Sequence, residues 1–382
     1  MEKFKLLIIG DANHQYIHNF SKWIRTVIPN ISITIVSFHS IKNTSTAELY
    51  FENYFEVPPN SKIISKIVGF RTIYLAYKLY RLMKNNNLTA DTILVHYVKS
   101  PLALIGYFLK KRTANYVMAI WGSDFYRVSS KKLLGINIKY ADNIIIGSPE
   151  MIMDFERAFE NEMNKVHLCY FGSEPIENIK KLKDSNINKI ESCMYFGFNA
   201  DKINITLGHN GSKAHQHVLI LNELNKLGPN VVDKIRVILP MTYGLDRNYL
   251  NEIISVCRDC PFEYKIFTDY MNDNEVAHLR NLTDIMINMQ KTDALSGSMR
   301  EVIFNGGVVV NGSWLPYQFL KDLGVYYEEA ESIQQISNKI SEIVLNYSFY
   351  KDKCKENSSK IFKISSWSET IYKWKEVILL KR

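Results

Sequence analysis

Residues 291–312 read KTDALSGSMREVIFNGGVVVNG, and this stretch indicates both the fold and the kind of site the chain carries. Asp293 is followed by a turn of small residues, which contains Ser296, Gly297 and Ser298. A helix is expected from about Ser298, and the Gly-Gly break followed by valines predicts a buried strand. The first N–H groups and the positive dipole end of such a helix suit an anion such as a diphosphate. Glu301, one turn inside the helix, would reach a sugar hydroxyl attached to that phosphate.

Short apolar strands alternate with helical segments on both sides of this stretch. Near-continuous apolar strands separated by helices are typical of a parallel sheet that is covered on both faces. The expected strands are 6–9, 31–36, 92–95, 116–120, 143–146 and 166–170, then 202–207, 234–239, 264–267, 285–289 and 308–310. The sequence therefore predicts an α/β fold of two doubly wound, Rossmann-like domains that face a cleft at the carboxyl ends of their strands.

The alternation pauses at Phe171–Pro175, and the polar stretch that follows is the expected domain linker. We expect an N-terminal domain over residues 1–175 and a second domain over residues 176–355. A length of 382 residues suits two domains of ordinary size.

Residues 356–382 are expected to end in a helix that packs back toward the N-terminal domain. Ser366-Trp-Ser-Glu369 matches a capping box, and an apolar stripe with helical spacing follows it. The stripe carries Trp367 and Trp374, and such a stripe must be buried. The alternative is a helix that lies on a membrane.

The composition is that of a globular chain, with 46% hydrophobic and 23% charged residues. No run of about 18 uncharged apolar residues occurs, and the N-terminus resembles a first buried strand more than a signal peptide. We expect a cytoplasmic protein. The five cysteines are scattered and odd in number, so no disulfide framework is implied, and Cys257 and Cys260 are expected to be reduced thiols.

Positive charge gathers in one window of the chain. Between Val57 and Tyr140 there are fourteen lysines and arginines and two acids, a net charge of +12 within an overall +8. Residues 70–84 interleave this charge with aromatic and aliphatic residues at helical spacing. They predict either a core helix with a basic rim or a helix that docks on an acidic membrane surface. Nucleic acid is not expected as a partner, because no recognised binding motif accompanies the charge.

The second domain opens with a glycine-bearing loop that is a further candidate for phosphate binding. Glycines after a first strand let the backbone approach a ligand, and a basic contact suits a departing nucleoside diphosphate. Lys213 is expected in that role, while the alternative is a plain turn between a strand and a helix. The candidate contacts in this loop are Gly208, Asn210, Gly211, Ser212 and Lys213. His215 and His217 are two apart, so they cannot form a metal pair on a helix, and one is expected to be exposed.

Three loops of the N-terminal domain follow predicted strands and carry groups for acid–base chemistry. Asp11, His96 and Asp124 could each act on an acceptor hydroxyl. The alternatives are helix capping for Asp11 or Asp124 and a satisfied core position for His96. The predicted cleft loops contain no pair of carboxylates for a metal, so we expect no metal and no bound cofactor.

With these residues located, the chain resembles the GT-B glycosyltransferases. Asp293 and Glu301 resemble the acidic-x7-Glu motif of a large retaining family, and Trp121-Gly-Ser-Asp124 resembles the Gly-x-Asp loop of many bacterial polysaccharide transferases. ITLGHNGSKAHQH at 205–217 and VILPMTYG at 237–244 are similar to a narrower family, although only over about residues 203–345. That family is the 4-acetamido-4,6-dideoxygalactose transferases, which act on an undecaprenyl-diphosphate-linked acceptor.

The resemblance implies a UDP- or dTDP-sugar donor as substrate, bound in the second domain. Glu301 would hold the nucleotide ribose, and Asp293 would lie near the donor sugar. Tyr243 and Tyr270 follow strands where the base and ribose would bind, and packing is the alternative for both. The resemblance also implies a lipid-linked or glycan acceptor, and an enzyme held at the inner face of the plasma membrane. A nucleotide-sugar epimerase or hydrolase, and a binding module without catalysis, are the alternatives.

Overall fold

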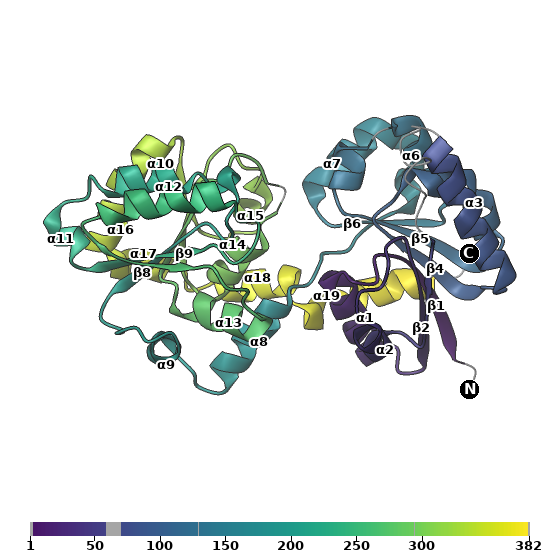
Figure 1. Cartoon of the computed structure of the whole chain (residues 1–382), viewed down its shortest axis with the longest axis horizontal. Coiled ribbons are helices and arrows are strands. Elements are labelled where there is room, and N and C mark those ends of the chain that lie inside the picture. Colours follow the sequence, from purple (N-terminus) through teal and green to yellow (C-terminus); the bar gives the residue numbers. More distant parts are fainter. Residues whose placement is uncertain (1–2, 59–69, 129, 294, 381–382) are drawn as a thin grey trace. The chain divides into compact units, whose positions relative to one another are not determined.

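The computed structural model describes residues 3–58, 70–128, 130–293 and 295–380, and it divides into two compact units. Unit 1 comprises residues 1–172 and 367–382, and unit 2 comprises residues 173–366. Each unit is a parallel sheet with helices on both faces (Figure 1), so the predicted α/β fold with two doubly wound domains is confirmed.

Unit 1 contains a seven-stranded sheet of order β3-β2-β1-β4-β5-β6-β7. Its strands are β1 (Phe4–Gly10), β2 (Ile31–Ser37), β3 (Asn53–Glu56), β4 (Ala90–His96), β5 (Thr113–Ile120), β6 (Asn143–Ile146) and β7 (Val166–Leu168). Its helices are α1 (Gln15–Val27), α2 (Thr44–Tyr50), α3 (Phe70–Asn85), η2 (Ser100–Leu104), α4 (Gly106–Lys110), α5 (Ser123–Tyr126), α6 (Lys131–Tyr140), α7 (Pro149–Phe159), η3 (Glu160–Lys165) and α19 (Trp367–Leu379).

Alternation along β1 shows how this sheet is buried on both faces. Leu7 and Ile9 enter the core beneath α3, α6 and α7, while Leu6 and Ile8 enter the core beneath α1, α2 and α19. Successive side chains of a strand point to opposite faces, so an unbroken apolar run is what two helical layers require.

Helix α19 completes the second of these cores, as the tryptophan stripe predicts. Trp367 and Trp374 are fully buried against α1 and the sheet, which excludes a membrane role for this stripe. The last carbonyls of α19 are satisfied by the sheet: Asn115 Nδ2 donates to Val377 O at 2.8 Å, and Thr92 Oγ1 donates to Ile378 O at 2.6 Å.

Unit 2 contains a six-stranded sheet of order β10-β9-β8-β11-β12-β13. Its strands are β8 (Ile203–Leu207), β9 (Ile235–Pro240), β10 (Glu263–Phe267), β11 (Ile285–Asn288), β12 (Val308–Gly312) and β13 (Glu328–Ala330). Its helices are α8 (Glu174–Asp184), α9 (Lys189–Tyr195), η4 (Lys213–His215), α10 (His217–Leu224), α11 (Pro229–Val232), α12 (Arg247–Arg258), α13 (Asp273–Leu282), α14 (Gly297–Phe304), α15 (Gln318–Asp322), η5 (Ile333–Gln335), α16 (Ile336–Leu345), α17 (Tyr347–Lys353) and α18 (Asn357–Ser365).

The polar stretch expected to be a linker forms helices α8 and α9 of unit 2. Ile176, Ile179 and Leu182 of α8 are buried, so this amphipathic helix belongs to the unit despite its polar composition. The chain leaves unit 1 after Gly172 and returns at Trp367, and α18 stays in unit 2.

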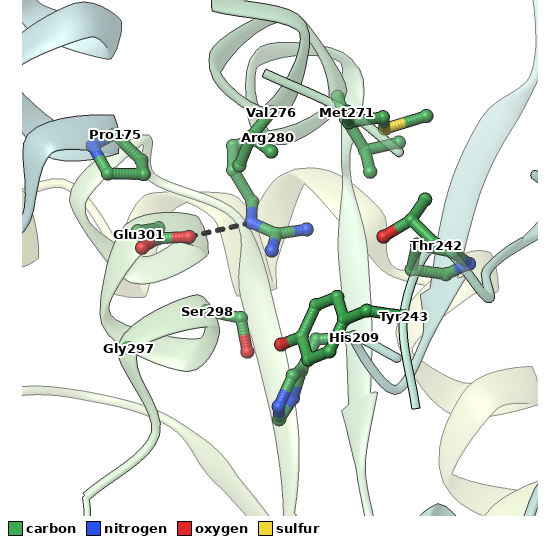
Figure 2. A pocket seen from close by; sticks show the side chains of 12 residues that line it. Pro175, His209, Thr242, Tyr243, Met271, Val276, Arg280, Gly297, Ser298 and Glu301 are labelled. Atoms are coloured by element: carbon green, nitrogen blue, oxygen red, sulfur yellow. Dashed lines mark hydrogen bonds and ion pairs between the residues drawn. The ribbon is translucent and has the colours of Figure 1, made fainter. Parts of the chain in front are cut away.

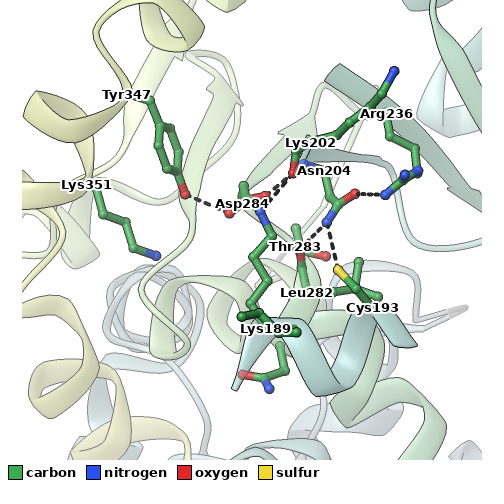
Figure 3. Close-up of polar contacts among 12 residues, drawn as sticks. Lys189, Cys193, Lys202, Asn204, Arg236, Leu282, Thr283, Asp284, Tyr347 and Lys351 are labelled. Atoms are coloured by element: carbon green, nitrogen blue, oxygen red, sulfur yellow. Dashed lines mark hydrogen bonds and ion pairs between the residues drawn. The ribbon is translucent and has the colours of Figure 1, made fainter. Parts of the chain in front are cut away.

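A buried polar network fastens unit 2 at the amino ends of its strands (Figure 3). Asp284, just before β11, accepts hydrogen bonds from Lys189 Nζ at 2.6 Å, Asn204 N at 2.8 Å and Tyr347 OH at 2.9 Å. Arg236 Nη1 donates to Asn204 Oδ1 at 3.0 Å and extends the network to β9. The network fixes the amino ends of the strands. The loops at the carboxyl ends of the strands take no part in it and can form a site.

Candidate functional site

A pocket of about 270 Å³ lies in unit 2, at the carboxyl ends of β8, β9 and β10. This volume is near the lower end of small-molecule sites, roughly 300 Å³. In an open parallel sheet, ligands bind at this edge, next to the point where the strand order reverses, which here is β8. The lining residues are Pro175, His209, Pro240, Thr242, Tyr243, Met271, Val276, Leu279, Arg280, Gly297, Ser298 and Glu301 (Figure 2).

The first turn of α14 forms one wall of this pocket. Ser296 is the N-cap, and its Oγ accepts a hydrogen bond from Met299 N at 3.2 Å, so the helix begins at Gly297. Gly297 and Ser298 line the pocket, which places first-turn N–H groups and the positive helix end beside it. The predicted turn at residues 296–298 therefore borders a cavity that suits an anion.

Glu301 lines the same pocket and is held from two sides. Arg280 Nε donates to Glu301 Oε2 at 3.0 Å, and Ser173 Oγ donates to Glu301 Oε1 at 2.9 Å. The side chains of Arg280 and Glu301 are 6% and 9% exposed, so this ion pair is almost fully enclosed. Its carboxylate stays beside the α14 start, where a ligand hydroxyl could still approach it.

Arg280 is a pocket residue that sequence reasoning missed. It lies in the last turn of α13, a position that belongs to no phosphate-binding motif. The available signal was its spacing from apolar Val276 and Ala277, which places a charged side chain on the inward face of an amphipathic helix.

His209 brings an imidazole to the pocket, and two further histidines lie behind it. His215 and His217 are both buried, which corrects the expectation that one would be exposed. Burial, with the nearby charges of His215 and Arg280, lowers the pKa of His209 to about 2. His209 is therefore neutral near pH 7 and supplies a hydrogen-bonding group instead of a charge.

The rest of the β8 loop shapes the pocket from outside. Gly208 has a φ of 65°, which favours glycine, and Asn210 Oδ1 accepts a hydrogen bond from Ser212 N at 2.8 Å. Gly211 N donates to Tyr243 O at 2.8 Å, and a Cβ at Gly211 would clash with Leu245 at 2.8 Å. These contacts position Tyr243, which does line the pocket.

Of the predicted contacts, only Tyr243, Gly297, Ser298 and Glu301 line the pocket, and Lys213, Tyr270 and Asp293 are among those that do not. Lys213 is 60% exposed, with Nζ 3.7 Å from Glu252 Oε1, and Tyr270 is 77% exposed. Asp293 accepts hydrogen bonds from Gln290 Nε2 at 2.5 Å and from the Tyr317 hydroxyl. Ser296 N donates to the same Tyr317 hydroxyl at 3.2 Å. Asp293 is therefore linked through Tyr317 to the N-cap residue of α14.

In unit 1, Asp124 makes structural contacts, which favour the structural alternative over the acid–base role expected for it. Its carboxylate is 3% exposed and accepts backbone hydrogen bonds from Val98 N at 2.8 Å, Trp121 N at 2.9 Å and Gly122 N at 3.0 Å. These bonds fasten the loops after β4 and β5 to each other.

His96 is likewise buried, as expected for the alternative of a core position. Its Nδ1 accepts a hydrogen bond from Trp121 Nε1 at 3.3 Å, and its ring stacks on Trp374 of α19. Burial lowers the pKa of His96 to about 3, so it is a neutral core residue. Asp11 is partly exposed and accepts hydrogen bonds from Asn13, so it is the member of the three that a ligand could contact.

Among the described residues, no group of three or more His, Cys, Asp or Glu side chains could hold a metal ion. No described helix has the length and apolar character needed to cross a membrane.

Comparison with known proteins supports the fold and gives context to the pocket. Residues 5–148 match the family described as Glycosyl transferase 4-like. No curated relative matches the chain at a significant level.

Solved structures extend the similarity to the whole chain. The chain is similar to Anabaena HepE in complex with UDP and glucose, at 14% identity, 98% coverage of each chain and a TM-score of 0.65. It is also similar to a glycosyltransferase of Rickettsia africae, at 12% identity, 99% and 98% coverage and a TM-score of 0.71. UDP-GlcNAc 2-epimerase of Neisseria meningitidis, bound to UDP-GlcNAc, gives 12% identity, 98% and 99% coverage and a TM-score of 0.66. The chain has the GT-B fold.

Proposed function

We propose that this chain is a glycosyltransferase that takes a sugar from a UDP- or dTDP-sugar bound in the unit 2 pocket. The observation that carries the proposal is the convergence of the α14 start with Glu301 inside one cavity. A nucleoside diphosphate needs an anion site next to an acceptor for ribose hydroxyls, and these two groups supply both. The match of residues 5–148 to a glycosyltransferase family and the UDP found in similar structures support it.

A lipid-linked acceptor at an anionic membrane surface completes the proposal. The outer face of α3 exposes Phe70, Ile73 and Tyr77, at 50%, 57% and 51%, while its opposite face packs into the core. Arg81 and Lys84 continue this outer stripe, since they follow at helical spacing. Exposed apolar groups beside cations suit the headgroup region of an acidic bilayer, from which an undecaprenyl-diphosphate type acceptor would be reached.

The transfer reaction is tested with Glu301→Gln. This variant keeps the shape of the side chain but removes the charge, so donor binding and sugar transfer should both fall, by at least about tenfold. Mass spectrometry of sugar transfer to a polyprenyl-diphosphate-linked acceptor measures it. Glu356→Gln is the matched control, because Glu356 is an exposed residue of unit 2 whose carboxylate pairs with Lys360 on the surface. Normal transfer by Glu301→Gln would sink the assignment of the donor site.

A nucleotide-sugar epimerase or hydrolase is the alternative, because an epimerase shares this fold. Incubation with UDP- and dTDP-sugars in the absence of any acceptor distinguishes them. An epimerised or hydrolysed sugar formed under these conditions at the full rate would replace the transferase proposal. Saturable nucleotide binding with no product under any condition would indicate a binding module.

A further inference from the structure

We propose that Arg280 binds the diphosphate of the donor, and that Glu301 orients it for this purpose. This inference rests on the proposed function, because it names a positioning residue for the same ligand. It differs from the expectation for Lys213, which would have supplied the cation from the β8 loop.

The first observation is that the guanidinium of Arg280 is buried but only partly used. Arg280 is 5% exposed, and its Nε is bound to Glu301, yet its Nη1 is buried and has no hydrogen-bond partner in the structure. A buried cationic N–H without an acceptor is costly, and a ligand in the adjoining pocket would supply that acceptor.

The second observation is where this group lies. Arg280 lines the pocket, and Figure 2 shows its guanidinium between Glu301 and Tyr243, near Ser298 and His209. The first turn of α14 borders the same cavity, so a cation and a positive helix end share one space. The described lining residues include no other lysine or arginine.

The chemistry of these groups selects the ligand class. The ion pair with Glu301 balances one positive charge, and the α14 start adds partial positive charge beside it. A guanidinium held by its Nε presents its remaining N–H groups in a fixed fork, which matches two oxygens of a phosphate. Neutral His209 adds a hydrogen-bonding group, and its buried Nδ1 also has no partner.

Glu301 then serves two purposes at once. It fixes the plane of the Arg280 guanidinium through Oε2, and it faces the pocket as an acceptor for a ribose hydroxyl. Glu301 would bind the ribose of a nucleoside diphosphate, and its partner Arg280 would bind the diphosphate. We infer that a nucleoside without phosphates uses only the Glu301 end.

Titration calorimetry of the full chain tests this with UDP and uridine, and with dTDP and thymidine. The wild type should bind the preferred diphosphate more tightly than its nucleoside. Arg280→Gln should raise the Kd of the diphosphate by at least about tenfold and leave that of the nucleoside within about twofold. The diphosphate Kd of Arg280→Lys should lie between those of the wild type and Arg280→Gln, because a point charge remains but the fork is lost.

Inorganic pyrophosphate supplies an independent readout. It should displace the nucleoside diphosphate from the wild type, and it should no longer do so at the same concentration in Arg280→Gln. Arg258→Gln is the matched control, since Arg258 is exposed in the last turn of α12, at the far end of that helix from its pocket-side start.

Removing Arg280 leaves Glu301 buried and unpaired, which could unfold the unit. The double variant Arg280→Gln with Glu301→Gln removes both charges, and it should also bind pyrophosphate poorly. An unchanged diphosphate Kd in Arg280→Gln would overturn this inference while leaving the donor pocket intact. Equal weakening of diphosphate and nucleoside would show a purely structural role and overturn it too. If the wild type binds no nucleotide at all, the proposed function itself fails.

Discussion

Asp124 and Glu301 are both buried carboxylates, but they differ in their hydrogen-bond partners and in whether they border a cavity. Asp124 is surrounded by three backbone N–H donors from two loops, so its oxygens are committed to the chain itself. Glu301 has one side-chain donor on each oxygen and a cavity beside it. Burial alone therefore does not identify a functional carboxylate, whereas an adjoining cavity does.

Asp124→Ala should destabilise unit 1 by about 3 kcal/mol, because three backbone N–H groups lose their acceptor. Asp124→Asn keeps one carbonyl oxygen and should cost less. Urea unfolding followed by circular dichroism measures both. Full stability of Asp124→Ala together with lost sugar transfer would return Asp124 to the acceptor chemistry that its position in the sequence first indicated.

At the scale of elements, α3 presents a face that the core does not use. Ala76, Leu79 and Met83 are buried, and Phe70, Ile73 and Tyr77 lie on the opposite side. The sequence offered a core helix with a basic rim and a membrane-docking helix as alternatives, and in the structure the helix packs in the core of unit 1. One face packs into the unit, and the opposite face exposes its apolar side chains, for which we propose membrane docking.

The triple variant Phe70→Ser, Ile73→Ser and Tyr77→Ser should bind vesicles of mixed phosphatidylglycerol and phosphatidylcholine at least about tenfold more weakly. Sedimentation with the vesicles measures this partition. Phe349→Ser is the control, because Phe349 is equally exposed but lies on α17 of unit 2.

Replacing Arg81 and Lys84 by glutamine should weaken binding only to the anionic vesicles and only at low salt. Binding that is unaffected by both sets of changes would exclude α3 as the docking surface.

Strands were predictable from sequence, and most site geometry was not. The apolar runs 6–9, 144–146 and 308–310 are suited to burial on two faces, so they predict central strands of the sheets. The amphipathic helix α8 was taken for a linker because its polar residues outnumber its apolar ones. The edge strand β3, with two exposed charged or polar ends, gave no apolar run to detect.

The candidate site was half predictable for a related reason. The α14 start follows from local turn chemistry, which the sequence records directly. The Arg280–Glu301 pair joins residues 21 apart on two helices, and only the packing of α13 beside α14 brings them together. Tertiary contacts of this kind leave no short-range pattern.

At the scale of the molecule, unit 2 is one continuous segment and unit 1 is made of two. Nucleotide binding should therefore stabilise unit 2 selectively. In differential scanning calorimetry, UDP or dTDP at 100 times its Kd should add about 2.7 kcal/mol to unit 2, which raises its transition and leaves that of unit 1 unchanged. A single transition that moves as a whole would instead indicate that the two units unfold cooperatively.

The return of α19 to unit 1 has a consequence for synthesis on the ribosome. Domains usually fold as units while the chain emerges, beginning from the N-terminal end. Here Phe20 and residues of β1 and β4 share a core with Trp367 and Trp374, which are translated after all of unit 2. This core is incomplete until α19 has been made. The segment that is made first is thus completed last, and until then its exposed apolar face is a natural substrate for chaperones.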